Sequence, residues 1–312
     1  MARAHPPFST EPVSVTNSAR CGPFASGDLV QLTDPKGRMH TITLTPGKSF
    51  HSHRGAIEHD DLIGLVQGSV VTNSGSTEYL ALRPLLDDFV LSMPRGAAVI
   101  YPKDAARIIG LAGLGPRMQV AEAGVGSGAL TCSLLRAVGD AGSVHSFERR
   151  ADFAEVATRN VATWFGGLPT CWRLTVGDLA EHLLETGLDA VVLDMLAPWE
   201  CLPAAALALE PGGVLVCYVA TTTQLSKIVE TLRSTGDWTE PRAEESLVRT
   251  WHLDGLSVRP DHRMSGHTGF LVTARRLAPG AVLPIRRRRP APGAYGHDYT
   301  GPGAIAETGP IV

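Results

Sequence analysis

The sequence predicts an α/β protein: a doubly wound, mostly parallel sheet with a terminal antiparallel strand pair, preceded by a small β-domain. Two observations support this prediction. Residues 21–95 alternate apolar and polar side chains as strands do, whereas residues 96–280 alternate short apolar runs with segments of helical period. Strands that alternate with helices form parallel sheets. Residues 1–20 and 281–312 are rich in Pro, Ser, Thr, Gly or Arg and are expected to be disordered tails.

Composition is that of a soluble globular protein. Of 312 residues, 44% are hydrophobic and 19% are charged, which allows a sizeable buried core. No run approaches the roughly 20 apolar residues that span a bilayer, and the first residues lack the apolar segment of a secretory signal. The five cysteines lack CxxC spacing, which predicts reduced thiols in a cytoplasmic protein without a zinc site.

The net charge of −3 does not indicate a general nucleic-acid binder, but the charge is unevenly distributed. From residue 241 onward, ten Arg stand against six acidic residues. This basic third could contact phosphate or could be an ordinary solvated tail, and charge alone leaves both open. The same choice applies to Arg286–Arg289, for which a solvated charge run is the default.

Four strands are expected in the β-domain. DLVQLTD (28–34) and RMHTITL (38–44) flank Pro35-Lys36-Gly37, a turn signal between two alternating runs, and so predict a hairpin. GLVQGSVVTNSG (64–75) and STEYLALRP (76–84) predict a second pair. No convincing helical period is present in this block, so it is expected to contain only strands and turns.

Five parallel strands are expected in the larger domain, each a short apolar run bounded by polar, Gly or Pro residues. The runs are MQVAEAG (118–124), SVHSFE (143–148), WRLTVGD (172–178), DAVVLDM (189–195) and GGVLVCYVA (212–220). Apolar residues three and four apart predict helices over 130–138, 153–161 and 225–232. SLVRTWHL (246–253) and TGFLVTARRL (268–277) have no helix between them and are the expected terminal antiparallel pair.

A glycine-rich loop follows the first strand of the larger domain. In EAGVGSGAL, Gly124, Gly126 and Gly128 let the backbone approach a ligand closely at a helix N-terminus. Glu148 ends the next strand, where a carboxylate can accept both hydroxyls of a ribose. The loop also fits G-x-G-x-x-A, the dinucleotide fingerprint, so by itself it does not identify the ligand.

Two further acids favour S-adenosylmethionine over a dinucleotide. Glu122 precedes the glycines, where it suits the ammonium of a methionine and not a pyrophosphate. Asp178 ends the third strand, where it can accept from an adenine amino group. Asp194 ends the fourth strand, in DAVVLDMLAPW, although desolvation there disfavours a charge. Each acid alone also fits a helix cap, but acids at the carboxyl ends of successive parallel strands indicate a ligand site.

Several motifs then have to be taken together. They are FHSHRGAIEHD (50–60), MPRGAAVIYPKDAA (93–106), EAGVGSGALT (122–131), LDMLAPW (193–199), YVATTTQL (218–225) and GHTGFLV (266–272). As a set they resemble the tRNA adenine-58 N1-methyltransferases, particularly the actinobacterial members, which are class I methyltransferases with a Rossmann-like sheet. The resemblance covers nearly all of 21–280. YPKD and LDMxxPW are more specific than the glycine loop, which all class I methyltransferases share.

The resemblance implies roles for individual residues. Asp194 would be the catalytic carboxylate, Tyr101 would act beside it, and Tyr101, Tyr218 and His267 would contact an adenine flipped out of the tRNA. The residues that would hold S-adenosylmethionine are Glu122, Ala123, Gly124, Gly126, Ser127, Gly128, Leu130, Glu148, Asp178 and Leu179. The partners implied are tRNA and three further copies of the chain in a homotetramer, with the β-domain contributing to the RNA surface and with no metal or membrane.

Together with the resemblance, the residues around Asp194 favour methylation of N1 of adenine. N1 carries a lone pair and needs alignment with the methyl group, while a carboxylate that accepts from the exocyclic amino group stabilises the positive charge that develops. Enzymes acting on N6 place a proline close behind the acid, whereas here Met195-Leu196-Ala197 precede Pro198. Methylation at C5 of a pyrimidine needs a nucleophilic cysteine, and Cys201 is expected to be a packing residue.

Some residues have two interpretations. His51, His53 and His59 could form a metal cluster, but with Arg54 adjacent a structural or phosphate-contact role is favoured. Trp199 could stack on a base, although anchoring the following helix is favoured. His267 could lie near the substrate or satisfy hydrogen bonds where a strand begins, and the two are equally supported.

Three other functions remain open. The chain could be a class I methyltransferase acting on a small molecule or protein, with the β-domain as a lid. It could be a non-catalytic tRNA-binding subunit, although such a subunit is expected to have lost the glycines or the strand-end acids. NAD-dependent redox chemistry is the weakest alternative, and binding measurements with both cofactors would separate it.

Overall fold

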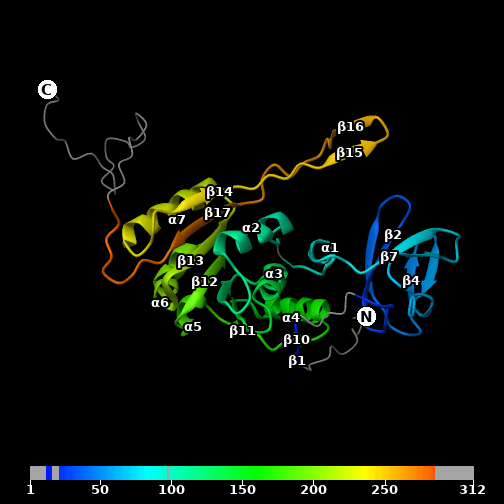
Figure 1. Ribbon diagram of the computed structural model, residues 1–312, viewed down its shortest axis with the longest axis horizontal. Coiled ribbons are helices and arrows are strands. Elements are labelled where there is room, and N and C mark those ends of the chain that lie inside the picture. The colour runs from blue at the N-terminus through cyan, green and yellow to red at the C-terminus, as the bar shows by residue number, and fades with distance from the viewer. Residues whose placement is uncertain (1–11, 16–20, 97, 285–312) are drawn as a thin grey trace. The chain divides into compact units, whose positions relative to one another are not determined.

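The computed structural model describes residues 12–15, 21–96 and 98–284 (Figure 1). Arg286–Arg289 and most of the two expected tails therefore lie outside the described residues. The chain divides into two compact units with the boundary between Asp178 and Leu179. Within the described part of the chain, none of the helices is long and apolar enough to cross a bilayer.

The β-domain contains the two hairpins that the sequence predicts. β2 (Leu29–Thr33) pairs antiparallel with β3 (Met39–Thr43), and β6 (Ser69–Thr72) pairs antiparallel with β7 (Glu78–Leu82). The four strands form one sheet in the order β3-β2-β7-β6. The apolar positions Val30 and Leu32 of β2 and Tyr79 and Ala81 of β7 are buried in one core with Phe24, which explains the period of two in the sequence.

Four elements of this region were not expected. β4 (Ser49–Ser52) and β5 (Gly55–Glu58) form a third hairpin, followed by the short 3-10 helix η1 (His59–Asp61). Helix α1 (Leu86–Ser92) corrects the expectation that this block holds only strands and turns. Seven residues make about two turns, which is too short to show a period in the sequence. The helix is formed because Leu86, Phe89 and Val90 are buried.

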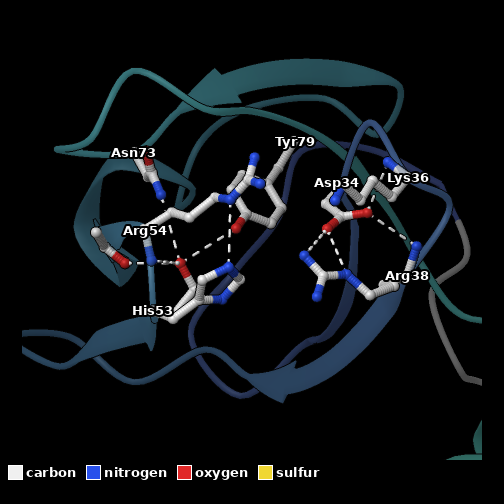
Figure 2. A network of polar contacts seen from close by, with 9 residues as sticks. Asp34, Lys36, Arg38, His53, Arg54, Asn73 and Tyr79 are labelled. Carbon is white, nitrogen blue, oxygen red and sulfur yellow. Dashed lines mark hydrogen bonds and ion pairs between the residues drawn. The ribbon is translucent and has the colours of Figure 1, made fainter.

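Asp34 holds the turn between β2 and β3 (Figure 2). Its Oδ1 accepts from the backbone N–H groups of Lys36 and Arg38, both at 2.9 Å, and its Oδ2 accepts from Arg38 Nε at 2.8 Å. Burial by itself would raise the pKa of Asp34, but hydrogen bonds from Arg38 and Lys36 and the charge of Arg38 lower it to about 2.

We expect this carboxylate to stabilise the fold in a pH-dependent way. Because the pKa of Asp34 is lower in the folded chain than its ordinary 3.8, its contribution is complete above that value and is lost as the pH falls towards about 2. The melting temperature of Asp34→Asn should therefore lie below that of the unmodified chain at pH 7, and the difference should vanish near pH 2. Asp254→Asn, at an exposed position of β15, is the control and should show no such convergence.

In the first unit, three of the expected parallel strands are present in the order β11-β9-β8. They are β8 (Gln119–Ala123), β9 (Ser143–Glu148) and β11 (Trp172–Val176). Three helices accompany them: α2 (Pro102–Ala112), α3 (Ala129–Val138) and α4 (Ala151–Phe165). The apolar positions that predicted α3, from Leu130 to Val138, are buried. Two short strands, β1 (Pro12–Val13) and β10 (Leu168–Pro169), pair parallel with each other.

In the second unit, four strands lie in the order β12-β13-β17-β14. β12 (Leu188–Asp194) and β13 (Leu209–Val219) are parallel, and β17 (Phe270–Arg275) is antiparallel to both β13 and β14 (Arg242–Glu244). The remaining elements are α5 (Leu179–His182), the 3-10 helix η2 (Pro198–Cys201), α6 (Leu202–Ala208) and α7 (Thr222–Thr235). The expected antiparallel end of a mostly parallel arrangement is confirmed.

The partner of β17 differs from the expected one. Residues 246–253 were expected to pair with it, but β14 does so, and β15 (Trp251–Asp254) pairs with β16 (Ser257–Pro260) in a separate hairpin. Figure 1 shows this hairpin at the end of two extended segments of the second unit. Trp251 and Leu253 are 56% and 73% exposed, so their apolar pattern does not report burial in the sheet.

Candidate active site

The glycine-rich loop joins β8 to α3 in the first unit. Gly124, Gly126 and Gly128 have φ of 84°, 56° and 79°, a left-handed region that favours glycine. A Cβ on Gly128 would also lie 3.3 Å from the backbone of Ala157 and from Val161. Backbone conformation therefore requires all three glycines, and close packing of the loop on α4 adds a second requirement at Gly128.

Asn160 of α4 holds the loop in place. Its buried side chain donates from Nδ2 to the carbonyl oxygen of Ser127 at 2.9 Å and to that of Pro94 at 2.8 Å. The second bond ties the loop to the segment that leads to Tyr101. Asn160 was not among the expected site residues, although a polar side chain next to Val161 on the apolar face of a helix is a signal for it.

Glu148 lies at the end of β9 beside the loop. Its Oε2 accepts from the backbone N–H of Gly126 at 3.0 Å, and its Oε1 accepts from the backbone N–H of Arg150 at 3.0 Å. The residue is buried, so these two donors stabilise a charge that is largely removed from water. Each carboxylate oxygen can still accept a further hydrogen bond from a ligand.

Glu122 is a deeply buried residue of β8, at 1% exposure. Its Oε2 accepts from the hydroxyl groups of Thr131 and Ser146, both at 2.8 Å. Ser146 in turn accepts from Trp172 Nε1 at 3.0 Å, so the carboxylate belongs to a network across β8, β9 and β11. The carboxyl group is thus held at one position directly before the glycine loop.

Asp178 follows β11 and forms an ion pair with Arg149, which follows β9. The backbone N–H of Gly177 donates to the carbonyl oxygen of Glu148 at 2.9 Å. The structure therefore brings the ends of β9 and β11 together, as expected for two residues of one site. The ion pair with Arg149 was not foreseen, because the two residues are far apart in the sequence.

The other expected cofactor residues are also buried. Ala123 ends β8, Ser127 lies in the glycine loop and Leu130 lies in the first turn of α3. Leu179 is also buried and begins α5 in the second unit. Ala123, Ser127 and Leu130 are thus on the same loop and helix start as the three glycines.

Tyr101 is the N-cap residue of α2, and its side chain is exposed. Its carbonyl oxygen accepts from the backbone N–H groups of Asp104 and Ala105, both at 2.9 Å. Lys103 Nζ lies 2.7 Å from the buried Asp104 Oδ1. The YPKD motif thus contains an ion pair between a partly buried lysine and a buried aspartate, shortly after an exposed tyrosine.

In the second unit, the structure brings Asp194 and Tyr218 together. Asp194 is the last residue of β12 and is partly exposed, and Tyr218 is its register partner on the parallel strand β13. A carboxylate and an aromatic side chain thus occupy neighbouring positions at the carboxyl ends of two adjacent strands. Such strand ends are where open α/β sheets bind ligands.

The GHTG segment before β17 packs on Tyr218. The Tyr218 hydroxyl donates to the carbonyl oxygen of Thr268 at 2.7 Å. A Cβ on Gly269 would lie 2.7 Å from that hydroxyl, so only glycine fits against the ring. This explains the glycine of the motif by close approach, since its φ is not in the left-handed region.

His267 in the same segment is hydrogen-bonded through both ring nitrogens. Its Nε2 lies 2.8 Å from the carbonyl oxygen of Ala220, and its Nδ1 lies 2.5 Å from Glu245 Oε1. Because both partners are acceptors, the arrangement suits a protonated imidazole. The ring also packs on Phe270, with centroids 4.7 Å apart, yet 43% of the side chain is exposed. These bonds agree with the interpretation that His267 supports the strand start.

The segment after Asp194 is held by packing and by Gln224. Trp199 lies in η2, and its ring contacts Lys227 Nζ of α7 at 4.0 Å, which agrees with an anchoring role. Cys201 is fully buried, as expected for a packing residue. Gln224 Nε2 donates to the carbonyl oxygen of Leu196 at 2.9 Å, and its Oε1 accepts from Thr221 N at 3.1 Å. Gln224 was not foreseen, although Thr221 and Gln224 have the spacing of a capping box.

His51, His53 and His59 of the β-domain do not form one cluster. His59 is buried, burial lowers its pKa, and its Nδ1 accepts from the backbone N–H of Thr45 at 3.0 Å. His51 and His53 lie on the hairpin of β4 and β5 and are exposed. Across residues 12–15, 21–96 and 98–284, no three His, Cys, Asp or Glu side chains gather in a group that could hold a metal ion.

Together with the parallel strands, the glycine-rich loop and the acids at the strand ends define the class of protein. The protein is a class I S-adenosylmethionine-dependent methyltransferase, and solved structures of that class resemble it. An S-adenosylmethionine-dependent O-methyltransferase from Thermotoga maritima is 28% identical, with a TM-score of 0.77, over 85% of this chain and 96% of that one. The tRNA (m1A58) methyltransferase TrmI from Aquifex aeolicus is 25% identical, with a TM-score of 0.72, over 82% and 100% of the two chains.

The chain belongs to the TrmI and GCD14 family of tRNA methyltransferases. Residues 22–71 match the TrmI-like N-terminal family, and residues 79–259 match the tRNA methyltransferase complex GCD14 subunit family. A tRNA (adenine(58)-N(1))-methyltransferase TrmI of Thermus thermophilus is 38% identical over 78% of this chain and 95% of its own. A tRNA (adenine(57)-N(1)/adenine(58)-N(1))-methyltransferase TrmI of Methanocaldococcus jannaschii is 30% identical over 78% of this chain and 93% of its own.

Proposed function

We propose that this protein transfers the methyl group of S-adenosylmethionine to N1 of adenine 58 in the T-loop of tRNA, giving 1-methyladenosine. The observation that carries the proposal is the neighbouring placement of Asp194 and Tyr218 at the ends of β12 and β13. A carboxylate beside an aromatic ring suits an unpaired adenine, which offers an amino group and a flat face. Similarity to TrmI over nearly the whole length of that relative supplies the tRNA position.

The first unit provides groups that fit S-adenosylmethionine, whose sulfonium supplies the methyl group when it is bound. Glu148, already oriented by Gly126 and Arg150, is proposed to accept from the ribose hydroxyls. Glu122 would face the methionine ammonium, because its charge is fixed beside the glycine loop. Asp178 would accept from the adenine amino group, and Arg149 would hold its carboxylate in place.

Further residues complete the proposed cofactor site. Gly124 and Gly128 would let the backbone lie close to the ligand. Ser127 would belong to the same contact surface, and the hydrogen bond from Asn160 to its carbonyl oxygen holds the loop in place. Apolar contacts would come from three buried residues, Ala123, Leu130 and Leu179.

The second unit provides the proposed acceptor groups. Asp194 would accept from the exocyclic amino group and so stabilise the positive charge that develops on the ring. Tyr218 would contact the base, with its ring held by Thr268 and Gly269. His267 would act through these neighbours, as the group that fixes the GHTG segment.

Tyr101, in the first unit, is the remaining aromatic residue of the proposed site. It is exposed, and it is proposed to contribute a second aromatic face to the acceptor base. Its position at the start of α2 is fixed by the backbone hydrogen bonds from Asp104 and Ala105.

We expect Gly269→Ala to raise the KM for tRNA about tenfold. The added methyl would overlap the Tyr218 ring and displace it, so a stacking contact of about 1–3 kcal/mol would be lost. Affinity for S-adenosylmethionine should not change. Gly266→Ala is the matched control, because a Cβ there meets nothing within 4 Å. Equal KM values for both variants would contradict the proposed role of Tyr218.

The proposed activity can be tested with unmodified tRNA transcripts and labelled S-adenosylmethionine, followed by nucleoside analysis. We expect 1-methyladenosine from a transcript with adenine at position 58 and none when that adenine is replaced. Label in 6-methyladenosine, or S-adenosylmethionine binding without any tRNA product, would overturn the proposal. A transcript carrying adenine at both 57 and 58 reports whether the second position is also modified.

The setting of the reaction is part of the proposal. We infer a homotetramer in the cytoplasm, with residues 21–95 serving RNA binding or assembly and 96–280 the methyl transfer. The residue types support this compartment, because the five cysteines are unbridged thiols. Measurement of molar mass by light scattering would test the oligomeric state.

A further inference from the structure

The end of β4 and the turn after it carry three exposed nitrogen-rich side chains in four residues, His51, His53 and Arg54, which together with Ser52 are called the β4–β5 tip. Residues 49–57 contain no acidic side chain. Within the described part of the chain, no ion pair involves Arg54, whereas several other arginines are paired with carboxylates. Arg54 is thus a positive charge of the tip that no carboxylate of the described residues pairs with.

Ser52 fixes the backbone of the tip by hydrogen bonds. Its Oγ donates to the carbonyl oxygen of Gly55 at 3.0 Å and accepts from Arg54 N at 3.2 Å. The buried Tyr79 hydroxyl donates to the same oxygen at 3.2 Å, and Asn73 Nδ2 lies 3.5 Å from it. One hydroxyl therefore joins the tip to the core of the β-domain.

A second turn, at residues 73–77, packs against the tip. Asn73 Oδ1 accepts from the backbone N–H groups of Gly75 and Thr77 at 3.0 and 2.8 Å and so closes that turn. A Cβ on Gly75 would overlap the carbonyl oxygen of Arg54, so the two turns pack backbone against backbone. The tip is preorganised, which reduces the entropy lost when it binds a partner.

The side chain of Arg54 is oriented but keeps donors available. Its Nε donates to His53 Nε2 at 3.2 Å, which leaves the two terminal nitrogens of the guanidinium (Figure 2). With Nε2 as acceptor, the proton of a neutral His53 is on Nδ1. A planar guanidinium with two free terminal groups matches the geometry of phosphate oxygens.

We propose that the β4–β5 tip binds a backbone phosphate of the tRNA, with Arg54 donating from its terminal nitrogens and His53 and His51 beside it. This inference rests on the proposed function, because it takes tRNA as the partner. It assigns an RNA contact to a part of the β-domain remote in sequence from the methyl-transfer residues.

The test is binding of an unmodified tRNA transcript, measured by fluorescence anisotropy at several salt concentrations. Arg54→Ala is expected to weaken binding about tenfold, as loss of a charge-assisted hydrogen bond implies. The slope of log affinity against log salt should fall by about 1, because one phosphate contact is lost. Arg54→Lys keeps the charge but not the planar pair of guanidinium donors. It should therefore keep the salt dependence of binding and lose part of the affinity.

Arg159→Ala, which removes an exposed arginine of α4 that pairs with Glu155, is the matched control and should bind tRNA as the unmodified chain does. Wild-type affinity and slope in Arg54→Ala would overturn the inference. Weaker binding that accompanies a change in molar mass would also overturn it, because the tip would then be an assembly contact. If the unmodified chain formed no 1-methyladenosine while binding still depended on Arg54, the proposed function would fail and this inference would stand.

Discussion

Asp194→Ala is expected to lose methyl transfer by at least about a hundredfold, the scale seen when one preorganised group that stabilises transition-state charge is removed. The product adenine carries a positive charge, and Asp194 ends β12 next to Tyr218, where a carboxylate can accept from the amino group of the ring. The effect should lie in kcat, because the interaction strengthens as the charge develops. Single-turnover assays with saturating tRNA would measure it.

Two comparisons make this result specific to the charge. Asp194→Asn keeps the size of the side chain and one acceptor oxygen but not the charge, so it should keep tRNA affinity and recover little of the rate. Affinity for S-adenosylmethionine and the melting temperature should be close to those of the unmodified chain in both variants. Unimpaired turnover in Asp194→Ala would remove Asp194 from the mechanism.

Glu148→Ala is expected to reduce affinity for S-adenosylmethionine on the order of a hundredfold or more. Two hydrogen bonds from ribose hydroxyls to a charged acceptor contribute about 1.5–3 kcal/mol each, and every 1.4 kcal/mol is tenfold. The variant also leaves the backbone N–H groups of Gly126 and Arg150 without this acceptor, so the loop loses part of its preorganisation. Isothermal titration calorimetry with S-adenosylmethionine measures the change.

Two further variants separate the loss of the ligand contact from the loss of loop structure. Glu148→Gln keeps an acceptor oxygen for one of the two backbone donors, so it should lose less affinity than Glu148→Ala. Glu155→Ala, at an exposed position of α4, should bind the cofactor normally. If Glu148→Ala bound S-adenosylmethionine as tightly as the unmodified chain, the ribose assignment would be wrong.

Most elements could be placed from the sequence because their burial is regular. β9 occupies the expected residues 143–148, and the other parallel strands lie within the expected runs or extend them by a few residues. The error at 246–253 has a physical cause. Apolar alternation predicts a strand with one buried face. Leu253 lies in the hairpin of β15, where it is exposed, so the same pattern occurs here without burial. Short elements such as α1 escape detection because two turns show no period.

By itself, the sequence determined the class of fold, the glycine loop and the acids at the strand ends, since each is a local pattern of residue types. The tertiary structure alone decided which of these groups meet and what holds them. Asn160 joins the glycine loop to Pro94, Arg149 pairs with Asp178, and Gly269 receives the ring of Tyr218. These contacts link positions tens of residues apart, and only the packing of strands and helices brings such positions together.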